Sequence, residues 1–278
     1  MAISLNAGLR REYEQLFETC RVRPERAADV ERTIDRLDQH RSRYEAVSNR
    51  QGVPWGFVAV VHNMESSGDF SRHLHNGDPL AARTVRVPAG RPRKGSPPFS
   101  WEDSATDAMA FKRLNANTDW SLAGLLYQLE KYNGWGYRLY HPHVLSPYLW
   151  CFSEHYERGK YVADGRWSDT AVSRQCGAAV LLRRMAEKGL VDFTDQPGVT
   201  LYTATEAKPA GRHKPLVSRH RMRRSSKPDM VKRDQELQRW LNTFPGIFLK
   251  IDGIPGDRTS DAYRVVTGGY LPGDPRDK

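Results

Sequence analysis

The sequence predicts an α+β protein that is predominantly α-helical. Apolar residues recur at helical spacing through much of the chain, and Val85-Arg86-Val87 alternates as a short strand would. The 278 residues, 38% of them hydrophobic, suffice for one large domain and a smaller one. We therefore expect a main helical domain with a small hairpin region over residues 1–190, a basic Pro- and Ser-rich linker over 191–229 and a small helical module over 230–278.

The first 50 residues are expected to form two amphipathic packing helices. One carries Leu9, Tyr13, Leu16 and Phe17 at helical spacing, and the other runs from Pro24 through Val30, Ile34, Leu37 and Tyr44. A third helix, over residues 54–65, opens on Pro54, whose missing backbone donor costs little in the first turn. Because this helix is mostly apolar, we expect it to be buried.

The next part of the main domain begins with a loop or hairpin region over residues 66–100, rich in Gly, Pro and basic residues. Ser100 and Asp103 form a capping box that predicts the start of a helix over 101–114. The remaining expected elements are a helix from Ser121, an aromatic segment over 132–167, a helix over 169–188, a helix containing Leu237 and Trp240, turns over 252–257 and a short helix from Thr259.

Glu65 ends the apolar helix and is followed by a polar loop that glycines interrupt. A carboxyl group in this position is desolvated, and the negative end of the helix dipole disfavours its ionised form. Both effects raise its pKa. A carboxyl that stays protonated near neutral pH can act as a general acid, so Glu65 is the first candidate catalytic residue.

Asp78 is the candidate for a second carboxylate. Cleaving a glycosidic bond with inversion needs a protonated carboxyl at the leaving oxygen and a carboxylate that activates water, about 6.5–9.5 Å apart. A glycine-containing hairpin can bring Asp78 back to face Glu65, and Asp69 competes with it for the role of base. Thr84 is a candidate to orient the attacking water. Each carboxylate alone is typical of a helix end or a turn, so the prediction depends on the pair.

These residues resemble the catalytic set of phage-type lysozymes, in which a Glu, an Asp and a Thr follow one another across a helix end and a hairpin. The step from Asp78 to Thr84 matches, and the segment from Glu65 to Asp78 is longer here. Glu65-Ser66 also resembles the Glu-Ser motif of lytic transglycosylases. The resemblance covers residues 50–185 and implies a domain of the lysozyme-like superfamily.

An aromatic run offers a wall for a sugar substrate. Tyr132-Asn133-Gly134 resembles the Tyr-Asn sugar-contact motif of the transglycosylases, and Tyr148 and Trp150 continue the run. Aromatic rings stack on the apolar faces of sugars, while Asn and Arg reach their polar groups. We predict substrate contacts from Tyr132, Asn133, Trp135, Tyr137 and Arg138, and from His62, which lies one helical turn before Glu65.

The sequence predicts neither a metal nor another cofactor. His62, His73 and His75 lie near Glu65 but complete no recognised zinc spacing. The three cysteines, Cys20, Cys151 and Cys176, are widely spaced and odd in number. We therefore expect them to be small buried apolar residues rather than redox or metal groups.

The net charge of +10 indicates attraction to a polyanion, and a cell wall, a nucleic acid and an anionic membrane all fit it. The basic stretch 208–233 belongs to no identifiable nucleic-acid-binding fold, so we expect no nucleic-acid partner. No stretch is apolar for the roughly 18 residues of a membrane span, and the first residues lack the pattern of a signal peptide. We expect a monomer, made in the cytoplasm, that does not insert into membranes.

The C-terminal module resembles the peptidoglycan-binding module of wall hydrolases. That module has a helix bearing Leu and Gln, then an Asp-Gly turn, a further Gly and a Thr before an Ala-bearing helix. Leu237-Gln238, Asp252-Gly253 and Thr259 match this order, while Pro255 and Asp257 depart from it. The resemblance implies affinity for the cell wall.

Together these resemblances imply a glycoside hydrolase of muramidase or endolysin type, which cleaves the β-1,4 glycan of peptidoglycan at the bacterial wall after release or export. Transglycosylases use a single catalytic Glu, so a carboxylate opposite Glu65 favours hydrolysis with inversion. Two alternatives stay open. The same fold can act on chitin, chitosan or another β-1,4 polysaccharide, or it can serve as a non-catalytic wall-binding or phage structural protein.

Overall fold

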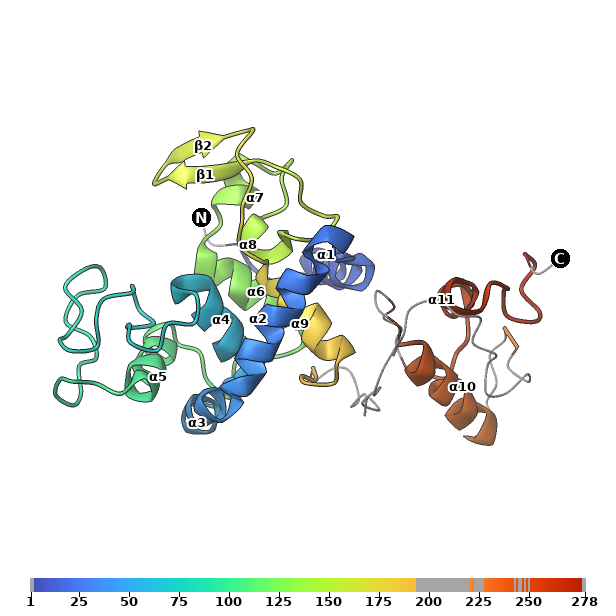
Figure 1. The fold of residues 1–278 in the computed structure, drawn as a ribbon, viewed down its shortest axis with the longest axis horizontal. Coiled ribbons are helices and arrows are strands. Elements are labelled where there is room, and N and C mark those ends of the chain that lie inside the picture. The colour runs from blue at the N-terminus through green and yellow to red at the C-terminus, as the bar shows by residue number, and fades with distance from the viewer. Residues whose placement is uncertain are drawn as a thin grey trace. The chain divides into compact units, whose positions relative to one another are not determined.

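The computed structural model describes residues 3–193, 221–222, 228–242, 244, 247, 249 and 251–276. The chain divides into two compact units, Met1–Arg184 and Met185–Lys278. Both are built mainly from helices, with one small β-hairpin in the first unit (Figure 1). The predicted α+β, predominantly α class is therefore confirmed. The predicted linker over 191–229 lies largely outside the described residues.

The described elements follow one another along the chain. The helices are α1 (Ala7–Thr19), the 3-10 helix η1 (Pro24–Arg26), α2 (Ala27–Gln39), α3 (Arg41–Gln51), α4 (Trp55–Ser66), α5 (Trp101–Phe111), α6 (Leu122–Asn133), α7 (Gly136–Tyr140), α8 (Pro147–Trp150), α9 (Ala178–Glu187), α10 (Pro228–Leu241) and α11 (Asp257–Thr267). The strands β1 (Lys160–Ala163) and β2 (Arg166–Ser168) pair antiparallel, with Tyr161 opposite Trp167. Among the described helices, none is long and apolar enough to cross a membrane.

The core of the first unit surrounds α4, the helix that ends near Glu65. Residues 56–63 of this helix are all buried, as its apolar sequence predicts. It packs against α3 on one side and α6 on another, and α6 contributes Leu125, Leu126 and Leu129 to the core. Helix α4 is therefore a rigid base for its C-terminal end.

The predicted starts of α5 and α6 are confirmed by their caps. The Ser100 hydroxyl accepts a hydrogen bond from the Asp103 backbone nitrogen at 3.1 Å. The Ser121 hydroxyl does the same for Gly124, also at 3.1 Å. Each serine satisfies a backbone donor that the first turn of a helix leaves free.

The helix predicted from Pro24 to Tyr44 is wrong in its extent, because the chain breaks at His40. This residue leaves the helical conformation (φ −102°, ψ 15°), and its ring contacts that of Phe70 at a centroid distance of 4.9 Å. The break turns α3 so that it packs against both α4 and α5. No glycine or proline marks this helix break in the sequence, so we attribute the break to tertiary packing.

The strand predicted at Val85-Arg86-Val87 is absent from the described structure. Val85 and Val87 are 79% and 91% exposed, so the alternation does not mark a buried face. The backbone nitrogens of Val85 and Arg86 donate to Asp78 Oδ2, at 2.8 and 3.0 Å, instead of to a neighbouring strand. The Asp78 side chain thus accepts the hydrogen bonds that a neighbouring strand would accept in a sheet.

The hairpin β1–β2 lies inside the predicted aromatic segment and was not anticipated. Its turn signal is present in the sequence, because Asp164-Gly165 is a dipeptide typical of tight hairpin turns. Gly165 has a φ of 65°, a conformation that favours glycine in such a turn.

The helix predicted over 169–188 begins only at Ala178. Before it, Gly177 passes so close to α8 that a Cβ atom would lie 2.3 Å from the Leu149 carbonyl oxygen. Gly177 also donates its backbone N–H to the Cys151 carbonyl at 2.9 Å. These close contacts hold Gly177 against the end of α8.

The second unit has its own small core, made by Leu237, Leu241, Ile247, Leu249, Ala262 and Leu271. The residues that resemble a peptidoglycan-binding module stabilise this fold. Gln238 donates to Asp252 Oδ1 at 2.9 Å and accepts from the Gly253 nitrogen at 2.8 Å. Gly253 has a φ of 69°, and a Cβ there would lie 2.8 Å from the Val231 carbonyl oxygen. The motif residues therefore stabilise the fold of the second unit, and affinity for the cell wall stays a prediction.

Candidate active site

The C-terminal end of α4 is held firmly. Ser67 adopts the left-handed conformation that ends many helices, and its N–H donates to the Asn63 carbonyl at 3.0 Å. The side-chain nitrogen of Gln175 donates to the carbonyls of Asn63 and Met64, at 3.0 and 2.9 Å. These bonds satisfy carbonyls that the last turn leaves free and fix the position of Glu65.

Glu65 meets three side chains that come from distant parts of the sequence. The Tyr148 hydroxyl donates to Glu65 Oε1 at 3.0 Å. The charges of Lys112 and Glu65 interact, and the Lys112 ammonium lies 4.5 Å from the centroid of the Tyr132 ring. Burial and the charge of Glu65 raise the pKa of Tyr132. The structure therefore brings together the predicted acid and one predicted substrate aromatic, with Lys112 and Tyr148 beside them.

Burial raises the pKa of Glu65 above its ordinary value, and the Tyr148 hydrogen bond and the Lys112 charge only partly offset this effect. Glu65 as a whole residue is nevertheless exposed, so its carboxyl is surrounded by protein and still open to solvent. Its position at the negative end of α4 also favours the protonated form. The arrangement suits a group that donates a proton to a large substrate.

Tyr148 is the neutral donor at this carboxyl. Burial raises the pKa of Tyr148 well above its ordinary value, so its hydroxyl keeps its proton. A donor of this kind stabilises the carboxylate that remains after Glu65 has given its proton away. We therefore predict a role for Tyr148 in the chemistry as well as in packing.

We predict that Tyr148→Phe moves the alkaline limb of the kcat/KM profile to higher pH. The Tyr148 hydrogen bond lowers the pKa of Glu65, so its removal lets the acid stay protonated further into the alkaline range. We expect kcat to fall about tenfold at the same time, because the carboxylate product loses its donor. Tyr140→Phe, at a tyrosine that is 71% exposed, is the matched control. If the alkaline limb of the kcat/KM profile does not move in Tyr148→Phe, the role of Tyr148 as a hydrogen-bond donor to the acid is contradicted.

Asp78, the predicted base, is bound within the loop over residues 66–100. Its Oδ2 accepts from the backbone nitrogens of Val85 and Arg86 and from the Asn76 side chain. Its Oδ1 lies 3.5 Å from Arg86 Nε, and the side chain is 7% exposed. These donors, with the backbone of Arg86 first, lower the pKa of Asp78. The described contacts give it the role of a loop anchor.

The other two residues of the predicted hydrolytic set also make internal contacts. Thr84 is buried, donates to the Pro88 carbonyl at 2.6 Å and accepts from the Arg91 nitrogen at 2.9 Å. Asp69 accepts from the Ser71 hydroxyl at 2.6 Å, and hydrogen bonds from Ser71 lower its pKa. Both residues stabilise turns, and their catalytic roles stay predictions.

His62 does not reach the substrate side of the site. It is fully buried, its Nδ1 lies 3.1 Å from the Tyr44 hydroxyl, and its ring packs against Phe70 and Trp101. Burial lowers its pKa to about 4, so it is a neutral core residue at neutral pH. The predicted substrate contact of His62 is not compatible with this burial.

Arg138 and Tyr137 are likewise tied into the fold. Arg138 donates to Glu130 and to Glu12, both at 2.8 Å, and so joins α7 to α6 and α1. Tyr137 is buried against Trp167 of the hairpin, with ring centroids 5.7 Å apart. These partners occupy the groups that were predicted to meet a sugar.

The remaining predicted contacts lie near the end of α6. Asn133 is exposed and is therefore free to meet a ligand. Trp135 packs against the ring of Tyr127 at a centroid distance of 5.2 Å. The aromatic wall predicted from the sequence is thus split, with Tyr132 and Tyr148 near Glu65 and Trp135 and Tyr137 in local packing.

Lys112 and Gln175 were missed by the sequence analysis. Lys112 follows directly after α5 and Gln175 lies outside the described helices and strands, so neither has a local pattern that marks a site. Only their contacts across the fold, with Tyr132 and with the end of α4, reveal them.

The three cysteines are free thiols and buried, as predicted. Burial raises the pKa of Cys151 and Cys176, so both are protonated and unreactive at neutral pH. Among the residues that the structure describes, no group of three or more His, Cys, Asp or Glu side chains is arranged to hold a metal ion.

Comparisons with protein-family models, curated proteins and solved structures find no match for this chain. The functional assignment therefore depends on the geometry at Glu65 and on the motifs around it.

Proposed function

We propose that this protein cleaves the β-1,4 glycan of bacterial peptidoglycan, with Glu65 as the general acid of a lysozyme-like main domain. The observation that carries the proposal is the carboxyl of Glu65 at the capped end of a buried helix, with a raised pKa and an open side. The adjacent tyrosines, Tyr132 and Tyr148, offer a polar and aromatic edge for a sugar.

In the proposed reaction, the Glu65 carboxyl gives its proton to the bridging oxygen as the bond from that oxygen to the anomeric carbon breaks. The electron pair of that bond leaves with the protonated oxygen. The new Glu65 carboxylate is stabilised by the Tyr148 hydroxyl and by the positive charge of Lys112. An oxygen nucleophile then completes the sugar product by bonding to the anomeric carbon.

The identity of that nucleophile distinguishes two reactions, hydrolysis and transglycosylation. Water activated by Asp78 or Asp69 gives hydrolysis with inversion, which is the version that the sequence favours. The 6-hydroxyl of the sugar itself gives an anhydro end and needs no second carboxylate, because the newly formed Glu65 carboxylate takes the hydroxyl proton. The hydrogen bonds that engage Asp78 within its loop favour this second version. We therefore keep transglycosylation as the second candidate.

Mass spectrometry of products made from purified peptidoglycan in ¹⁸O-labelled water tests both versions. Labelled reducing ends mean hydrolysis, and Asp78→Asn should then reduce their release about 10²-fold or more. Unlabelled anhydro ends mean transglycosylation, and Asp78→Asn should then act mainly by loosening the loop. If the intact protein releases neither product from peptidoglycan, chitin or chitosan, the enzyme proposal is wrong and a wall-binding or structural role replaces it.

The second unit and the charge support the same substrate. The fold around Gln238 and Asp252-Gly253 is consistent with the peptidoglycan-binding module that its motif resembles. A net charge of +10 favours an anionic polymer such as the cell wall. We propose that the second unit holds the enzyme at the wall as a monomer.

A further inference from the structure

A large basic cavity lies along one face of α2. Its volume is about 910 Å³, and five cationic side chains line it. We define this basic groove by those side chains, Arg26, Arg32, Arg36, Lys160 and Arg174. Asp29 is the one carboxylate among the described residues that line the groove. The groove therefore carries a strong excess of positive charge.

Three of these cations have no described carboxylate partner. Asp29 pairs with both Arg26 and Arg32, so its single charge is already shared. Arg36 donates to the neutral side-chain oxygen of Asn63 at 2.7 Å. In the described part of the chain, no carboxylate lies within ion-pair distance of Arg36, Lys160 or Arg174. Unpaired cations around a concave surface concentrate anions there.

The cations are spread along the groove rather than gathered at one point. Arg32 and Arg36 are about one helical turn apart on α2, and Arg26 directly precedes this helix. Ten residues of helix are about 15 Å long, so the row from Arg26 to Arg36 exceeds the size of a single small anion. Lys160 comes from β1, and Arg174 precedes α9. A ligand that meets all five cations needs several anionic groups in succession.

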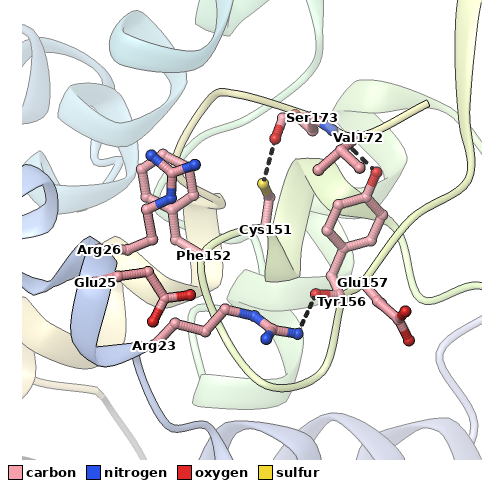
Figure 2. A pocket seen from close by; sticks show the side chains of 9 residues that line it. All are labelled: Arg23, Glu25, Arg26, Cys151, Phe152, Tyr156, Glu157, Val172 and Ser173. Atoms are coloured by element: carbon pink, nitrogen blue, oxygen red, sulfur yellow. Dashed lines mark hydrogen bonds between the residues drawn. The ribbon is translucent and has the colours of Figure 1, made fainter. Parts of the chain in front are cut away.

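The excess of positive charge ends at Arg26. Beside this residue, a smaller cavity of about 200 Å³ shares Arg26 with the groove and is also lined by Arg23, Glu25 and Glu157 (Figure 2). In this smaller cavity the two carboxylates offset the two guanidinium groups. It therefore offers an anion no net attraction, and the groove alone is the candidate anion site.

The groove offers no free aromatic surface among its described residues. Phe152 is the one aromatic side chain that lines it, is only 8% exposed, and has the Arg26 guanidinium 4.7 Å from its ring centroid (Figure 2). Proteins that bind single-stranded nucleic acids stack the bases on accessible rings. The neutral polar part of the lining instead supplies hydroxyl and amide groups, from Thr33, Asn63, Ser67, Ser173 and Gln175. These groups suit a chain of phosphates and alcohols better than a chain of bases.

We propose that the basic groove binds a polyol phosphate chain, in which small alcohol units are joined by phosphodiesters. Guanidinium and ammonium groups form charge-assisted hydrogen bonds with phosphate oxygens. Arg36 is already held by Asn63, so its guanidinium loses little freedom on binding. An anionic bilayer fits less well, because a flat surface meets the rim of a cavity and not its lining. Glu65 does not line the groove, so this inference does not depend on the proposed function.

The test is calorimetric titration of the full-length protein with a short poly(glycerol phosphate). The variant is Lys160→Gln/Arg174→Gln, because neither side chain has a described hydrogen-bond partner to lose. We expect its Kd to rise about tenfold, and the slope of log Kd against log salt concentration to fall by about 1–2, as two phosphate contacts are lost. The matched control is Arg11→Gln/Lys94→Gln, which replaces one exposed arginine and one exposed lysine elsewhere in the first unit. Its Kd should stay within twofold of wild type.

Equal weakening in the two double variants would mean that net charge alone attracts the polymer, and would overturn the groove as a site. Failure of the wild-type protein to bind the polymer would overturn it as well. Double-stranded DNA and phosphatidylglycerol vesicles are titrated at the same phosphate concentration. If either binds as tightly as the polymer and loses affinity in Lys160→Gln/Arg174→Gln, the partner is a nucleic acid or a membrane and the proposal is wrong.

The Glu65→Gln protein separates this inference from the proposed function. It should bind the polymer as wild type does, because Glu65 does not line the groove. A wild-type protein that cleaves no glycan but shows the expected loss of binding in Lys160→Gln/Arg174→Gln would refute the proposed function alone. A protein that cleaves glycan but binds the polymer equally in all variants would refute the groove alone.

Discussion

Glu65→Gln is expected to reduce glycan cleavage by about 10³-fold or more, because an amide of the same shape cannot supply the proton that the leaving oxygen needs. The variant keeps an acceptor for the Tyr148 hydroxyl, so the geometry of the site is preserved. Release of soluble fragments from purified peptidoglycan is the measurement. Glu14→Gln, at an exposed residue of α1, controls for the change in charge.

The same variant should not lose stability. A protonated Glu65 with a raised folded-state pKa favours the folded state at low pH, and this contribution is lost as the pH rises through that raised pKa. Glutamine does not titrate, so Glu65→Gln should be at least as stable as wild type above that pH. Full cleavage activity in Glu65→Gln, at normal stability, would contradict the assignment of the acid.

Glu130→Ala is expected to destabilise the first unit by about 3–5 kcal/mol, the usual effect of removing one partner of a buried ion pair. The Glu130 carboxylate is 4% exposed and joins three helices, since it accepts from Arg138 at 2.8 Å and from the Tyr13 hydroxyl. Without it, the partly buried Arg138 keeps only Glu12 as a carboxylate partner, and the buried Tyr13 hydroxyl loses its acceptor. Denaturant unfolding of wild type and variant gives the difference.

Glu45→Ala is the matched control for this prediction. Glu45 pairs with Arg41 at 2.8 Å, but both side chains are 43% exposed. We expect a loss of only about 0.3–0.5 kcal/mol for an exposed pair of this spacing. Equal effects of the two substitutions would show that the Glu130 network adds no special stability.

The sequence predicts well those features that depend on local chemistry. The apolar run of α4 and the caps at Ser100 and Ser121 appear where their patterns indicate. Glu65 emerges at the helix end because the run of apolar residues stops there. Local patterns of this kind need no knowledge of the rest of the chain.

Features that depend on contacts across the fold could not be predicted in this way. Tyr148 reaches Glu65 across 83 positions of sequence, and Lys112, which follows α5, meets Tyr132 of α6. The spacing of Asp78 and Thr84 suggested that they complete a catalytic set with Glu65, whereas their described partners lie within one loop. Spacing shows which residues can meet, and packing decides which of them do.

The most direct test of the account is an NMR titration of the Glu65 side-chain carboxyl in protein labelled with ¹³C-glutamate, with Glu65→Gln used to assign the signal. The account predicts a midpoint above the ordinary value of 4.5, and a further rise in Tyr148→Phe. A midpoint at or below 4.5 would mean that Glu65 is already ionised where the enzyme must work, and would contradict its role as the acid.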